Sequence, residues 1–225
     1  MKITDKPEHD PVSDLLLTDA YMCWALLSAE EVVGKNGLAV VLRQIGLAQL
    51  IGNYPPNQLK STVGLRFGHY TALNAGLLEF FGRAARSMAL RIGRQSSRYA
   101  IEYQGALFGT AALLASKVLP LGTQVKMGLL AAQLGLRRLS QAAGQEHRFA
   151  LEDRGERWAY IDYDDALSAG KRADEPMGWV QTGALQQALL WQTGKEFTVE
   201  QVACRSLGHP ASVWEVSKAP APQAS

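Results

Sequence analysis

The sequence predicts an α+β fold in which an N-terminal helical half is followed by a C-terminal antiparallel sheet of strand–strand–helix–strand–strand order, packed on the helices. Two observations predict this fold. Apolar residues recur about every 3.6 positions as far as residue 142, as one face of an α-helix requires. From residue 148 onward the period changes to about 2, in two pairs of short stretches that flank one further helical stretch.

The helices of the first half are separated by turn residues. A Gly-Lys-Asn-Gly turn at 34–37 and a Pro-Pro loop at 54–56 interrupt the helical pattern, because glycine and proline favour turns. Gly82 ends one helix, and Pro120 with Gly122 ends another. The expected helices are 14–33, 38–51, 67–81, 83–116 and 124–142.

In the C-terminal third, Arg154-Gly155-Glu156 separates two alternating stretches, as in a β-hairpin. A helix follows and is capped by Gly194, and a second strand pair surrounds Gly208-His209-Pro210. The expected strands are 148–153, 157–164, 197–207 and 212–218, and the expected helix is 180–191. We expect a disordered leader at 1–12, a single domain at 13–218 and a disordered tail at 219–225.

Composition excludes several classes of protein. The 225 residues are 47% hydrophobic and 20% charged, which is a globular balance rather than that of a disordered chain. Two cysteines cannot build a disulfide scaffold, so a reducing, cytoplasmic location is expected. The polar N-terminus is unlike a secretory signal. The uncharged run 103–116 is shorter than the roughly 20 residues that a spanning helix needs.

The charge is unevenly distributed, although the net charge is only +2. Residues 80–145 hold nine basic residues and one acid. On a helical projection, one face of 83–98 carries Arg83, Arg86, Arg91, Arg94 and Arg98. This face indicates an anionic partner or an anionic membrane surface, or else a solvated basic face neutralised by acids elsewhere in the fold. Nucleic acid is not an expected partner, because the arginines are not interleaved with exposed aromatic residues.

No catalytic motif is present. The sequence has no GxSxG, no nucleotide-binding GxGxxG or GxxxxGK[ST], and no HExxH. A metal centre of the protein is not expected, although a single histidine could ligate a tetrapyrrole metal. His69, in an otherwise apolar helix, is the best candidate, with a core histidine as the alternative. An apolar interior bordered by arginines would suit a large apolar ligand that carries a carboxylate.

The stretch CRSLGHPASVWEV at 204–216 resembles the C-terminal signature of the 4-vinyl reductase domain family. The stretches at 30–47, 72–94, 118–129 and 183–200 also resemble this family, and the likeness covers about 20–218. Cys204, Gly208 and Pro210 match the signature. His209 and Ser212 depart from it, since the family has aspartate and a second cysteine there.

The resemblance implies a non-enzymatic small-ligand-binding domain, similar to transport-particle subunits. It implies a carrier or assembly factor for chlorophyll or a related tetrapyrrole in chlorophyll biosynthesis or photosystem assembly. The partners would be photosystem or pigment-synthesis proteins, with peripheral contact at the photosynthetic membrane and a possible homo- or heterodimer. The alternatives are a 4-vinyl reductase or its accessory subunit, and an assembly factor with no ligand. The expected ligand-binding residues are His69, Arg91, Arg94, Tyr99 and Cys204.

Overall fold

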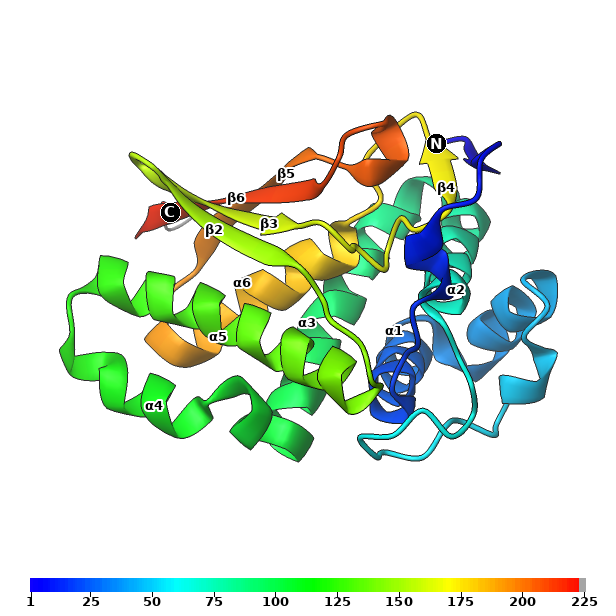
Figure 1. The fold of residues 1–225 in the computed structure, drawn as a ribbon, viewed down its shortest axis with the longest axis horizontal. Coiled ribbons are helices and arrows are strands. Elements are labelled where there is room, and N and C mark those ends of the chain that lie inside the picture. The colour runs from blue at the N-terminus through cyan, green and yellow to red at the C-terminus, as the bar shows by residue number, and fades with distance from the viewer. Residues whose placement is uncertain (223–225) are drawn as a thin grey trace.

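A computed structural model describes residues 1–222 and confirms the α+β fold. Figure 1 shows an antiparallel sheet lying on α5 and α6, with α3 and α4 on the far side of these helices and α1 and α2 at the other end of the molecule. The helices are α1 Asp19–Gln44, α2 Phe67–Phe81, α3 Ala85–Gln104, α4 Thr110–Ala115, α5 Leu121–Ala142 and α6 Trp179–Thr193. The strands are β1 Ile3–Asp5, β2 Phe149–Arg154, β3 Arg157–Asp162, β4 Lys171–Ala173, β5 Phe197–Ala203 and β6 Ser212–Pro220.

Glycines decide where the observed helices depart from the expected ones. The stretch expected to be helical over 83–116 ends at Gln104, continues as a 3-10 turn over Gly105–Phe108, and restarts as α4 after Gly109. Gly109 has φ of +63°, a left-handed conformation that interrupts a helix. The turn expected at 34–37 is a kink within α1, where Gly34 has φ of +78°.

The main sheet has the order β2-β3-β6-β5, with all neighbours antiparallel. In the register of β3 and β6, Tyr160 pairs with Trp214, and both side chains are fully buried. They belong to a cluster with Val125 of α5 and Leu189 of α6, so one face of the sheet is covered by these two helices. The strand–strand–helix–strand–strand order expected from the sequence is therefore present.

The N-terminal residues are not a disordered leader, which corrects the expectation for 1–12. β1 pairs with β4 in a small second sheet, with Thr4 opposite Arg172. The carboxylate of Asp10 accepts hydrogen bonds from Arg205 (2.9 Å), Lys6 (2.8 Å) and the backbone N–H of Gly170 (3.0 Å). At the other end β6 continues to Pro220, and residues 223–225 of the expected tail lie outside the described residues.

Helices α3 and α6 touch backbone to backbone through two glycines. A methyl group placed on Gly93 would lie 1.9 Å from the carbonyl oxygen of Val180, and one on Gly183 would lie 2.1 Å from that of Leu90. Neither backbone can move aside without shifting a helix. Gly93 therefore lies in the helix for close packing, at the expense of helix propensity.

We expect Gly93→Ala to lower the free energy of unfolding by about 2 kcal/mol or more, because overpacking against backbone outweighs the helix propensity gained. Gly122→Ala in α5 is the matched control, since nothing lies within 4 Å of a methyl group there. This variant should be neutral or more stable by up to about 1 kcal/mol. Urea denaturation measures both, and equal stability of the two variants would contradict the packing argument.

A second prediction concerns acid stability. Burial raises the pKa of Asp10, but hydrogen bonds from Lys6, Gly170 and Arg205 outweigh burial and hold this pKa well below its ordinary value of 3.8. The Asp10 carboxylate therefore stabilises the fold at pH values above its unfolded-state pKa. This stabilisation is lost as the pH falls toward its folded-state pKa. Asp10→Asn should cost about 3 kcal/mol at neutral pH, and the difference from the native chain should shrink below about pH 4. Denaturation at several pH values measures this, and a difference independent of pH would refute it.

Candidate functional site

An apolar cavity lies among the helices on the side of α5 and α6 away from the sheet. All six α-helices contribute side chains to its walls. The enclosed space is about 90 Å³, and the whole hollow with its open mouth is about 820 Å³. Residues from the apolar stretch 103–136 form one wall, among them Phe108, Leu113 and Leu136.

The cavity exists because small residues face it from two neighbouring helices. Gly128, Ala131 and Ala132 line it from α5, and Ala184 and Ala188 line it from α6. Larger side chains at these positions would fill the space, as they do elsewhere in protein cores. Trp24 and Trp191 are among the aromatic side chains that line it. This arrangement can hold an apolar molecule away from water.

A few polar groups interrupt the apolar lining. Ser96 and Ser97 of α3, Thr110 of α4 and Gln181 of α6 are part of the wall. Such groups can orient a ligand that has one hydroxyl or carbonyl group. Within residues 1–222 no arginine, lysine or histidine is among the lining side chains, so the cavity has no counter-ion for a carboxylate.

Two tyrosines also line the cavity. Tyr21 of α1 stacks on Tyr70 of α2, with the ring centroids 5.1 Å apart. Burial is the first cause that raises the pKa of both phenols, and the carboxylate of Asp165 raises both further. Both side chains can therefore serve as neutral hydrogen-bonding groups in the cavity wall.

A small second pocket lies behind Tyr21, and it shares Tyr21, Leu136 and Leu139 with the cavity. His147 lines this pocket. Its Nε2 lies 2.8 Å from the carboxylate of Asp162, and its Nδ1 lies 3.3 Å from the hydroxyl of Ser140. All three side chains are buried. The imidazole is thus held on both nitrogens by the protein itself.

The residues expected to bind ligand lie apart from one another, and none is among those that line the cavity. His69 is at the start of α2, where its Nδ1 accepts a hydrogen bond from the backbone N–H of Arg66 (2.9 Å). Burial and the charge of Arg66 lower its pKa. Cys204 is fully buried beside Ser206, next to the small second sheet rather than the cavity.

The other expected residues belong to α3. Arg94 pairs with Glu196 (2.9 Å), and the hydroxyl of Tyr99 donates to Glu31 (3.0 Å). Arg91 is exposed, as are most arginines of this face. Arg86 lies over the ring of Trp179, 3.9 Å from its centroid. The arginine face therefore points away from the cavity, because α3 turns Ser96 and Ala100 inward instead.

Sequence reasoning missed the lining of α5 and α6. The pattern that could have revealed this lining is the recurrence of glycine and alanine at helical spacing, at 128, 131, 132 and 135 and at 184 and 188. It also missed His147, which lies two residues before the start of β2 and belongs to no motif. Over the described residues there is no group of three or more His, Cys, Asp and Glu side chains placed to hold a metal. No helix found in residues 1–222 has both the length and the apolar character to cross a bilayer.

Comparison with known proteins relates the fold to H-NOX domains. An Fe(II) unliganded H-NOX protein from K. algicida superposes with a TM-score of 0.55 at 13% identity, covering 93% of this chain and 100% of its own. An H-NOX structure from work on haem distortion in that family has a TM-score of 0.55 at 13% identity, covering 93% and 99%. An oxygen-binding H-NOX domain related to soluble guanylate cyclases, in its oxygen complex, has a TM-score of 0.51 at 14% identity, covering 90% and 95%.

These findings correct the family resemblance drawn from the sequence. No family model matches the chain, and no curated protein matches it. The structural neighbours named above are H-NOX domains, so the assignment to the 4-vinyl reductase domain family was wrong. The chlorophyll, photosystem and photosynthetic-membrane expectations depended on that assignment and are without support. At 13–14% identity the comparisons show a shared fold.

Proposed function

We propose that this chain is a non-enzymatic small-ligand-binding domain that holds an apolar molecule in the helical cavity, and that residues 13–218 form this domain, to which the N-terminal residues add a strand. The observation that carries the proposal is the apolar hollow between α5 and α6, lined by Ala131, Ala132, Ala184 and Ala188. Cores of this kind are normally close-packed, so a hollow with a mouth is typical of a binding site.

The lining determines the chemistry of the ligand. Without a basic side chain in the wall, a carboxylate or phosphate inside the cavity would lack a partner, and burying it would be unfavourable. The hydroxyls of Ser96, Ser97 and Thr110 fit one neutral polar group. We therefore propose an uncharged, mostly apolar ligand.

A tetrapyrrole is the second candidate, because the similar H-NOX structures include one from work on haem distortion. The residues present do not fit a haem whose iron is held by an axial imidazole, thiolate or thioether group. The cavity wall in residues 1–222 has no histidine, cysteine or methionine. His147 lies behind Tyr21 with both nitrogens engaged.

The cavity is tested with the uncharged dye N-phenyl-1-naphthylamine, whose emission rises in apolar surroundings. We expect saturable binding that Ala188→Phe weakens about tenfold or more, since the new ring would fill the space that α6 leaves open. Ala142→Phe, an exposed position on the last turn of α5, is the matched control and should bind as the native chain does. Loss of binding in both variants, or in neither, would contradict the proposed site.

Titration with haem tests the second candidate. We expect no spectrum of an iron with a protein imidazole or thiolate ligand, because the wall offers neither group. Metal-free protoporphyrin is the parallel probe, since it needs no axial ligand. An imidazole-ligated haem spectrum that disappears in His147→Ala, with the fold retained by circular dichroism, would overturn this assignment and identify a rearranged haem site.

A further inference from the structure

Exposed apolar side chains gather on one part of the molecule. Six of the large apolar residues that are exposed in the described chain fall within residues 103–134. They are Tyr103, Leu114, Val118, Leu119, Leu130 and Leu134. Val118, in the turn between α4 and α5, is 90% exposed. Isolated exposed apolar residues are ordinary, but a group of them on adjacent elements indicates an interaction surface.

Helix α5 presents part of this group as a stripe. Lys126, Leu130, Leu134 and Arg138 follow one another at i,i+4 spacing, so they lie on a single helix face. Leu130 is 44% exposed and Leu134 is 41% exposed. The opposite side of α5 is buried, through Val125 and Leu129 among others. The two exposed leucines therefore have a positively charged side chain at either end of the stripe.

The charge of this region has one sign. No aspartate or glutamate occurs from 103 to 145, while Lys117, Lys126, Arg137 and Arg138 do. None of these four cations forms an ion pair with a residue of the described chain. Asp153, an acid close enough to feel the charge of Lys126, is paired with Lys218 (2.5 Å). Lys126 lies over the ring of Trp158, and Arg137 and Arg138 donate hydrogen bonds to the backbone carbonyls of Phe149 (2.9 Å) and Leu107 (2.9 Å). These contacts do not neutralise charge, so the region carries a net positive charge that can attract an anionic surface.

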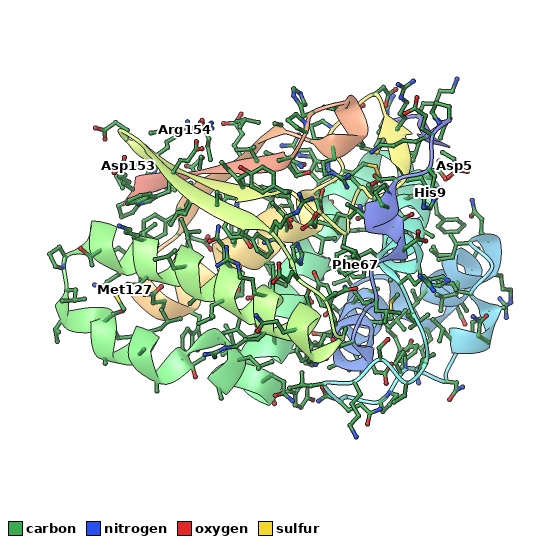
Figure 2. All side chains as sticks on the ribbon, viewed as in Figure 1. Asp5, His9, Phe67, Met127, Asp153 and Arg154 are labelled. Carbon is green, nitrogen blue, oxygen red and sulfur yellow. The ribbon has the colours of Figure 1, made fainter. Side chains whose placement is uncertain are left out.

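The group lies at one end of the molecule. Figure 1 shows α4 and its turn into α5 at the end opposite the N-terminus, and Figure 2 labels Met127 there, with Asp5 and His9 far from it. We define the α4–α5 face as residues 114–119 together with Lys126, Leu130, Leu134, Arg137 and Arg138. Within this face the side chain of Val118 is the most exposed to solvent.

We propose that the α4–α5 face docks on the surface of an anionic lipid bilayer, with Val118 and Leu119 inserted among the headgroups and the four cations at the lipid phosphates. Exposed leucines flanked by lysine and arginine are typical of interfacial membrane-binding helices. A projecting turn suits shallow insertion, whereas a stable protein partner would need a face of roughly 800 Å² with complementary shape. The proposal does not depend on what the cavity holds.

Co-sedimentation with lipid vesicles tests the docking. We expect the protein to bind vesicles of phosphatidylcholine mixed with phosphatidylserine, to bind less as salt is raised, and to leave vesicles of phosphatidylcholine alone largely unbound. Leu130→Ser with Leu134→Ser should weaken binding by about tenfold or more. Val202→Ser on β5 is the control, because Val202 is 45% exposed but lies on the sheet edge.

A second set of variants tests the contribution of the positive charges to vesicle binding. Lys117→Gln with Lys126→Gln should weaken binding to the anionic vesicles by about tenfold or more. Lys195→Gln, an exposed lysine between α6 and β5, should leave it unchanged. Circular dichroism confirms that each variant is folded, so a loss of binding is not a loss of structure.

Insertion has a separate readout. A solvatochromic dye on Val118→Cys should shift to the blue on anionic vesicles, and the same dye on Val63→Cys, also exposed, should not. The native cysteines are buried and do not compete for the label. Absence of binding to anionic vesicles, equal effects of the test and control variants, or no shift at residue 118 overturns the proposal. Formation of a dimer that Leu130→Ser with Leu134→Ser abolishes, without vesicle binding, also overturns it.

Discussion

The contact between the backbones of α3 and α6 at Gly93 and Gly183 fixes the architecture around the cavity. It sets the distance between one helix beneath the sheet and one helix on the far side of the hollow. Close to this contact, Ser96 and Ala100 of α3 and Ala184 and Ala188 of α6 line the cavity. Small residues on α3 and α6 therefore allow both the close approach of the two helices and the cavity beside it. A side chain at either glycine would move α6, and with it both the cover of the sheet and a wall of the cavity.

Much of the fold could be predicted from the sequence because it is encoded locally. The bounds of α2 agree with the expected 67–81, and the change of period located the sheet with its intervening helix. The features that escaped prediction depend on partners far away in the chain. Gly93 weakens a helix when it is considered alone, and only the backbone of Val180 explains it. Asp10 stands in a polar leader, and only Arg205 shows why that leader is ordered.

The site was less predictable than the fold. A row of arginines is easily noticed, but a cavity is formed by the side chains that are missing, at glycine and alanine positions such as Gly128 and Ala131. Arg94 was expected to meet a ligand, and the structure pairs it with Glu196, which lies about a hundred positions away in the sequence. Short stretches that resemble a family can be shared by unrelated chains, whereas the fold comparison uses the path of nearly the whole backbone.

Helix α4 has only six residues, and one side of it faces the cavity while the other faces solvent. Leu113 lines the cavity and is buried, and Leu114 is exposed on the outer surface. This segment, between Gly109 and Pro120, separates the cavity from the outer surface by the thickness of one helix. An oily molecule that reached Leu114 from outside would be separated from the interior by a single turn of chain. A movement of α4 would therefore change both the contacts of Leu114 on the outer surface and the volume of the cavity.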